Sequence, residues 1–136
     1  MDDSRVFQAS ISELSKMLRW VRSKLKMYEV ENKKCGRIEL ALEEALVNII
    51  FHAYTHSAGI LEIQVSYYKE DRVIEFTILD QGKPFNPLEY QKLDITSNVE
   101  QRIPGGLGIH FLKKISDDLS YLRRGESNIL SIRNQL

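Results

Sequence analysis

The stretch Val73-Ile-Glu-Phe-Thr-Ile-Leu79, followed by Asp80-Gln-Gly-Lys-Pro-Phe-Asn-Pro87, decides how the rest of the chain is arranged. Its first part is an apolar run of strand length, and its second part begins with an acid and continues with Gly and Pro, which is typical of a loop at the end of a sheet. We expect Asp80 where the strand stops, with its carboxylate directed outward to accept a hydrogen bond from a ligand. Gly82 would let the backbone approach that ligand, because it has no side chain. Alone, Asp-x-Gly most often marks a turn, so its meaning depends on the flanking segments.

Strand-like segments before and after this region predict two hairpins. Residues 61–67 alternate apolar and polar side chains, the pattern of a half-buried strand, and a polar turn leads back into residues 73–79. Near the end of the chain, residues 119–123 and 129–133 are joined by a turn that contains glycine. The sequence therefore predicts a sheet to which each hairpin contributes a pair of strands.

The N-terminal region predicts a short edge strand at residues 5–9 and then a helix. Ser10 and Glu13 have the spacing of a capping box, in which Ser10 caps the helix and Glu13 reaches back. The opposite face is basic, and we interpret it as a solvated helix face, with contact to an acidic partner as the alternative. Its basic residues are Lys16, Arg19, Arg22, Lys24 and Lys26. The expected apolar stripe consists of Ile11, Leu14, Leu18, Val21, Leu25 and Tyr28.

A second helix is predicted from about Asn32 to about Tyr54. Glu44 and Asn48 lie one turn apart on a face different from the apolar stripe. A carboxylate and a carboxamide stacked in this way can serve as a base and a metal ligand, although an exposed polar pair is the alternative. Asn is unfavourable inside a helix, which suggests that another requirement keeps it there. The expected buried stripe consists of Ile38, Leu42, Ala45, Leu46, Ile49 and Ala53.

Residues 83–104 show little periodicity and form an unusually long connection, which is typical of a functional lid or of disorder. Gly105-Gly-Leu-Gly108 follows and opens an apparent helix. Free amides at such a helix start can bind phosphate, although a plain joint between a loop and a helix is the alternative. The chain has no P-loop motif, and this glycine run does not follow a first strand as a dinucleotide fold requires.

The composition predicts a single domain over residues 1–136. Hydrophobic residues make up 43% of the chain, and Lys+Arg and Asp+Glu number 19 each, so neither a nucleic-acid nor a membrane-surface partner is expected. The single Cys35 and the absence of a signal-peptide-like start or a membrane-length apolar run predict a cytoplasmic protein. The expected fold class is α+β, a two-layer sandwich in which helices cover one face of a mixed β-sheet.

Taken together, Glu44-x-x-x-Asn48, Asp80-x-Gly82 and Gly106-x-Gly108 resemble, in order, the ATP-binding boxes of the GHKL superfamily with its Bergerat fold. The longer stretches Glu43-Glu-Ala-Leu-Val-Asn-Ile-Ile-Phe-His-Ala-Tyr54 and Asp80-Gln-Gly-Lys-Pro-Phe-Asn-Pro87 are similar to those of the anti-sigma-factor serine kinases of bacterial partner-switching systems. This resemblance covers nearly the whole chain, and ordered boxes are more specific than any single box.

The resemblance implies a role for each matching residue. Asn48 would coordinate Mg²⁺, and Glu44 would accept the hydroxyl proton of a substrate serine. Asp80 would accept a hydrogen bond from the adenine amino group of ATP, and Gly82 would let the base lie flat. Residues 83–104 would be the ATP lid.

The remaining nucleotide-binding residues implied by the resemblance lie toward the C-terminus. Family members often have a lid arginine near the γ-phosphate and a threonine near the last hairpin, for which Arg102 and Ser127 are the candidates here. Arg102 differs in its spacing from the glycines, and the alignment of Ser127 is open. The glycine box that would present amides to the phosphates consists of Gly105, Gly106, Leu107 and Gly108.

The function implied is that of an ATP-dependent protein serine kinase. Its substrate would be a STAS-type anti-sigma-factor antagonist, and it would also sequester a sigma factor and form a homodimer. Two alternatives stay open: a catalytically weak, nucleotide-binding anti-sigma module, and the ATP-binding domain of a split histidine kinase. Loss of Glu44 would leave the activity of the first alternative unchanged, and phosphohistidine on a partner would support the second.

Overall fold

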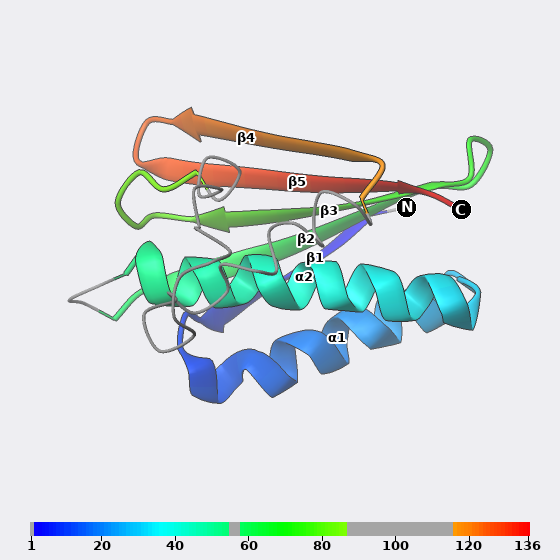
Figure 1. Cartoon of the computed structure of the whole chain (residues 1–136), viewed down its shortest axis with the longest axis horizontal. Helices are drawn as coiled ribbons and strands as arrows, with labels where there is room; N and C mark the ends of the chain where they lie inside the picture. Colours follow the sequence, from blue (N-terminus) through cyan, green and yellow to red (C-terminus); the bar gives the residue numbers. More distant parts are fainter. Residues whose placement is uncertain (1, 55–57, 87–115) are drawn as a thin grey trace, which may run out of the picture.

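The computed structural model describes residues 2–54, 58–86 and 116–136. Figure 1 shows a sheet on one side and two helices side by side on the other, which confirms the expected two-layer α+β arrangement. The elements in chain order are β1 (Asp2–Gln8), a 3-10 turn (Ile11–Glu13), α1 (Leu14–Met27), α2 (Asn32–His52), β2 (Ile60–Tyr68), β3 (Val73–Asp80), β4 (Asp118–Arg124) and β5 (Ser127–Gln135).

The five strands lie in the order β1-β2-β3-β5-β4, with β1 at one edge and β4 at the other. All neighbouring pairs among the described residues are antiparallel, so the expectation of a mixed sheet is corrected. The reason is the placement of the terminal hairpin. Strands β3 and β4 run in the same direction, but β5 lies between them and hydrogen-bonds to both, so no parallel pair forms.

The core lies between the helices and the inner face of the sheet. Side chains alternate along β2, β3 and β5, and the inward positions are apolar over most of their length. The stripe expected on α2 is confirmed, because each of its members is buried. The most enclosed side chains on the sheet are Leu61, Ile63, Ile74, Phe76 and Ile78.

The expected capping box at the start of α1 is wrong. Ser10 makes no side-chain cap, and its hydroxyl instead contacts the Ser12 hydroxyl at 2.9 Å. The Glu13 carboxylate lies 3.4 Å from Lys16 Nζ, so it faces along the helix and does not reach back. A single 3-10 turn comes before α1, and this shifts the helix start past the residues that the box requires.

The stripe expected on α1 is confirmed from Leu14 onward, because those members are buried or pack against the core, and only its first residue differs. Ile11 is 52% exposed, whereas Met17 is fully enclosed. Lys24, expected on the basic face, is buried: its ammonium forms an ion pair with Asp3 of β1 and lies over the Trp20 ring. No helix within the described ranges is long and apolar enough to cross a membrane.

Candidate functional site

The inner face of the sheet changes from apolar to polar at the end where β3 stops. The register places Asp80 opposite Leu61 of β2 on one side and opposite Asn128 of β5 on the other, and Asn128 opposite Arg123 of β4. The next cross-strand pair on the same face, Ile78 and Leu130, is apolar and buried. The candidate site therefore begins where the apolar core ends, at the left-hand end of the sheet in Figure 1.

The Asp80 carboxylate is held in one orientation by two hydrogen bonds. Its Oδ1 accepts from the Gly82 amide at 2.9 Å and from Asn128 Nδ2 at 2.8 Å. Burial raises the pKa of Asp80, and the bonds from Asn128 and Gly82 together with the nearby Arg123 charge oppose that rise. Among the described residues no hydrogen bond goes to Oδ2, which leaves that oxygen available to a ligand.

The loop after β3 is fastened to the C-terminal end of α2. The Lys83 amide donates to the Ala53 carbonyl at 3.0 Å, and the Gln81 amide donates to the Tyr54 hydroxyl at 2.7 Å. Gly82 lies so close to this helix end that a Cβ would come within 2.4 Å of the Ala53 carbonyl oxygen. Packing against α2 is therefore one physical reason for glycine here, and the sequence did not reveal it.

We expect Gly82→Ala to lower the free energy of unfolding by about 1–3 kcal/mol, because the new methyl group overlaps backbone atoms that cannot rotate away. Chemical denaturation would measure the change. Gly36→Ala within α2 is the matched control, since its new Cβ meets nothing within 4 Å. That control should gain up to about 1 kcal/mol from better helix propensity. Equal stability of the wild type and Gly82→Ala would contradict this account of the loop.

Two polar side chains on α2 carry oxygen atoms that have no partner among the described residues. Asn48 is completely buried, and its Nδ2 donates to the Glu44 backbone carbonyl at 2.7 Å. That bond uses the donor end of the carboxamide, so Oδ1 is left as a buried acceptor without a donor. Glu44 Oε2 is likewise buried and unpartnered. The cost of leaving such an atom unpaired is about 1–3 kcal/mol, so these oxygens are suited to a ligand.

The environment of Glu44 affects its protonation. Burial raises the pKa of the Glu44 carboxyl, and repulsion from Glu43 raises it further. A carboxyl with a raised pKa is a stronger base once ionised, which is the property that a proton acceptor in catalysis needs.

The donor set fits a magnesium ion that shares its coordination sphere with a ligand. The described residues contain no cluster of three or more His, Cys, Asp or Glu side chains that could hold a metal by itself. Mg²⁺ prefers oxygen ligands and commonly takes only one or two from the protein, with water and phosphate supplying the rest. The unpartnered Oδ1 of Asn48 meets that requirement.

The α2 pair and Asp80 belong to the same end of the molecule. Asn48 lies about 7.5 Å along the helix axis from Ala53, at about 1.5 Å per residue. Ala53 in turn contacts Gly82 and Lys83 of the loop after Asp80. The structure thus brings the first two of the expected boxes to one end of the sheet.

Several expected site residues lie outside the described residues or away from these contacts. Ser127 is half-buried at the start of β5, opposite Arg124, and the adjacent Asn128 makes the contacts to Asp80. His52, the last residue of α2, stacks on Phe85 with ring centroids 4.9 Å apart. The expected lid beyond residue 86 and the residues Arg102, Gly105, Gly106, Leu107 and Gly108 lie outside the described ranges.

Asn128 is the site residue that the sequence analysis missed. It is 3% exposed and shares the inward face of β5 with Leu130 and Ile132. A signal was present, since an asparagine in phase with buried apolar residues of a strand must have partners for its amide. Its position directly opposite Asp80 follows only from the register between β3 and β5.

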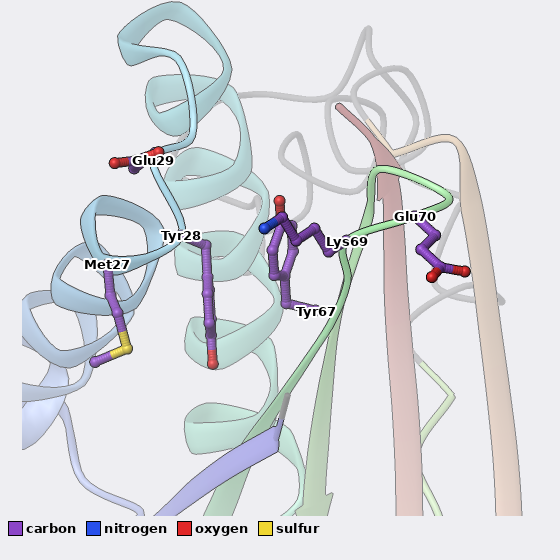
Figure 2. A pocket seen from close by; sticks show the side chains of 6 residues that line it. All are labelled: Met27, Tyr28, Glu29, Tyr67, Lys69 and Glu70. Carbon is purple, nitrogen blue, oxygen red and sulfur yellow. The ribbon is translucent and has the colours of Figure 1, made fainter.

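A second concave region lies at the opposite end of the sheet and is separate from this site. Figure 2 shows Tyr28 and Tyr67 facing each other between the end of α1 and β2, with ring centroids 4.7 Å apart. Tyr67 is six positions along β2 from Leu61, the partner of Asp80, which is about 20 Å at about 3.4 Å per residue. The cavity measures about 490 Å³ and is lined by Met27, Tyr28, Glu29, Tyr67, Lys69 and Glu70.

Comparisons with known proteins identify the family of the chain. The model of the histidine kinase-like ATPase domain family matches residues 7–134. The serine/threonine-protein kinase BtrW of Bordetella bronchiseptica is 29% identical over 97 residues, covering 70% of this chain and 66% of BtrW. The serine-protein kinase RsbW of Bacillus mycoides is 32% identical over 89 residues, covering 62% of this chain and 54% of RsbW. The chain therefore matches about two thirds of one relative and about half of the other.

A solved structure shares the fold across almost the entire chain. The crystal structure of the RsbU and RsbW domains of Rv1364c from Mycobacterium tuberculosis aligns with a TM-score of 0.71 and 12% sequence identity. The alignment covers 99% of this chain and 32% of the other. This likeness supports the two-layer arrangement described above.

Proposed function

Since the chain belongs to the family of histidine kinase-like ATPase domains, we propose that it is an ATP-dependent protein serine kinase. Its substrate is an anti-sigma-factor antagonist, and the chain also sequesters a sigma factor. When the antagonist is unphosphorylated, it binds the chain, and the sigma factor is released. The names of the relatives BtrW and RsbW support a kinase that acts on a protein hydroxyl. A homodimer is part of the proposal.

The observation that carries the proposal is a pair of buried oxygens one helical turn apart in sequence, Glu44 Oε2 and Asn48 Oδ1, to which no described residue donates a hydrogen bond. Nucleotide binding by itself requires no base, so a carboxylate kept without a hydrogen-bond donor favours catalysis. Glu44 would accept the proton of the attacking serine hydroxyl, and Asn48 would hold Mg²⁺ through its free oxygen. When bound, ATP with Mg²⁺ would supply the phosphoryl group and the positive charge that neutralises its oxygens.

The other described residues of the site position the nucleotide. Oδ2 of Asp80 would accept from the amino group of adenine, because Oδ1 is already used by Gly82 and Asn128. Positioning and charge neutralisation supply most of the rate in phosphoryl transfer, so few reactive side chains suffice. Transfer to the antagonist would place a phosphate dianion in its contact surface and release it from the kinase.

The experiment that tests the proposal combines the purified chain with Mg²⁺, γ-labelled ATP and candidate antagonists encoded in the same genome. We expect label on one serine of an antagonist, and the matched control is that antagonist with its serine changed to alanine. ATP binding without any labelled protein would favour the nucleotide-binding anti-sigma module. Acid-labile label on a histidine would favour the split histidine kinase, and failure to bind ATP would overturn the proposal.

The raised pKa of Glu44 predicts the pH dependence of the transfer rate. The base must be ionised, so the rate should fall as the pH drops through a pKa that lies above the ordinary value of glutamate. Removing the neighbouring charge by Glu43→Gln should lower the pKa of Glu44 and move this acid limb to lower pH. The pH profile of single-turnover transfer would measure the shift. A limb that moves to higher pH, or does not move, would contradict the assigned influence of Glu43.

A further inference from the structure

We propose that Asn128 is a positioning residue that makes the site selective for a purine with an amino group at position 6. It does so by holding one oxygen of Asp80 so that the other faces the base. This inference rests on the proposed function, because it assigns a role within the same nucleotide site. It concerns a residue that the motifs of the sequence do not include.

The Asn128 side chain uses both ends of its carboxamide. Nδ2 donates to Asp80 Oδ1 at 2.8 Å and to the Lys83 carbonyl at 2.9 Å. Oδ1 accepts from the Tyr121 hydroxyl, from Arg123 Nη1 at 3.2 Å and from the Phe85 amide at 3.4 Å. Only a carboxamide offers a double donor and an acceptor in this space, so the contacts specify asparagine.

These contacts determine which oxygen of Asp80 a ligand can reach. Asp80 Oδ1 receives the bonds from both Asn128 and the Gly82 amide, and the described residues send none to Oδ2. With the carboxylate fixed in this way, Oδ2 accepts a hydrogen bond from a base that carries an amino group. A 6-oxo base would instead direct an oxygen at the carboxylate, and two acceptors repel each other.

The terminal hairpin supports Asn128 from β4. Arg123 donates from Nη1 to the Gly82 carbonyl at 2.8 Å as well as to Asn128 Oδ1. It therefore ties β4 to the loop that carries Gly82 and keeps a positive charge close to Asp80. Tyr121 lies two residues before Arg123 on the same face of β4, and its hydroxyl donates to Asn128 Oδ1 from the side of the core.

The experiment compares the affinity for ATP with that for ITP, which has an oxygen in place of the adenine amino group. Asn128→Leu keeps the size of the side chain and removes every hydrogen bond, and we expect it to reduce the ATP-over-ITP preference about tenfold or more. Asn134→Leu is the matched control: it lies on the same buried face of β5 but at the far end, opposite Ile74. A preference unchanged in Asn128→Leu, or an equal loss of both affinities, would overturn the inference.

A second variant keeps the test decisive where Asn128→Leu does not fold. Asn128→Asp has the same shape, but when ionised it repels Asp80, and when protonated it can donate to Asp80 again. Its ATP-over-ITP preference should therefore be higher in acidic than in alkaline buffer. The wild type serves as the reference over the same range, because Tyr121 and Arg123 of β4 and His52 near Phe85 also surround this group. A preference that does not rise in acid would count against the inference.

A readout without nucleotide separates this inference from the proposed function. If the wild type binds neither ATP nor ITP, the proposed function fails. The link between Asn128 and Asp80 can still be tested, because NMR of the Asp80 carboxyl carbon during a pH titration measures the pKa of Asp80 directly. Loss of the Asn128 hydrogen bond should raise the pKa of Asp80, since that bond stabilises the ionised form. An unchanged titration in Asn128→Leu would overturn the positioning role.

Discussion

Replacing Glu44 with Gln is expected to lower phosphoryl transfer to the antagonist serine about 10²–10⁴-fold, the usual contribution of a general base. Affinity for ATP should stay close to that of the wild type, because Asp80 and Asn48 are unchanged. Glutamine has nearly the same shape as glutamate but cannot accept the hydroxyl proton. Single-turnover transfer from γ-labelled ATP and calorimetric titration with ATP measure the two effects separately.

The fold should tolerate this substitution. Burial raises the pKa of Glu44 in the folded state, so its ionisation disfavours folding once the pH rises above the unfolded-state pKa, and the full penalty is reached above the folded pKa. A neutral side chain removes that penalty, and Glu44→Gln should unfold at the same or a higher temperature at neutral pH. Glu43→Gln on the neighbouring position is the control and should retain transfer. Full transfer activity in Glu44→Gln would refute its role as the base.

Asn48→Leu is expected to remove the Mg²⁺ dependence of ATP binding and to weaken ATP binding in the presence of Mg²⁺ by about 10²-fold. Loss of the Asn48 oxygen would remove the proposed protein ligand of the metal, and even changes behind a metal ligand commonly cost about 10–100-fold. Titration of ATP with Mg²⁺ and again with a chelator measures this effect. In the presence of the chelator, the variant and the wild type should bind ATP with similar affinity.

The thermal stability of the ligand-free Asn48→Leu variant should not fall, in contrast to its affinity for ATP. Leucine has a similar size, favours helices and removes the buried Asn48 oxygen that no described residue pairs with, so the ligand-free variant should be at least as stable as the wild type. Thermal unfolding without ligand would show this. A variant that binds Mg²⁺ and ATP like the wild type would contradict the assignment of Asn48 as the metal ligand.

Most of the fold could be predicted because helices and strands that bury one face repeat their apolar side chains at regular intervals. The α2 stripe and the strand alternation around residues 61–67 and 73–79 correspond to elements with nearly the same bounds. The order of strands was harder to predict, since nothing in a short segment determines that β5 lies next to β3. That one placement makes the sheet antiparallel throughout the described part.

The start of α1 shows where a motif at correct spacing fails. Ser10 and Glu13 fit a capping box, but the 3-10 turn changes the direction of both side chains. Lys24 was assigned to a solvated face by its charge, yet β1 supplies Asp3 as its partner. The first case is local, because a 3-10 turn forms where the capping box was expected. The second case depends on a long-range contact between α1 and β1, which the sequence pattern of a single helix does not contain.

The candidate site likewise contains residues that the sequence could predict and residues that it could not. Glu44, Asn48 and Asp80 could be proposed because they follow each other at characteristic spacings. Asn128 could not, because its role depends on a cross-strand register that joins residues far apart in the chain. The reason for glycine at position 82 was likewise hidden, since the Ala53 backbone that excludes a side chain belongs to another element.

The most direct test of the account is a crystal structure of the chain with Mg²⁺ and a non-hydrolysable ATP analogue. We predict the amino group of adenine on Asp80 Oδ2, the Asn128 bond to Oδ1 retained, and the metal on the Asn48 oxygen, all at the end of the sheet where β3 stops. Nucleotide bound between Tyr28 and Tyr67 at the opposite end, or an adenine that makes no contact with Asp80, would contradict the account.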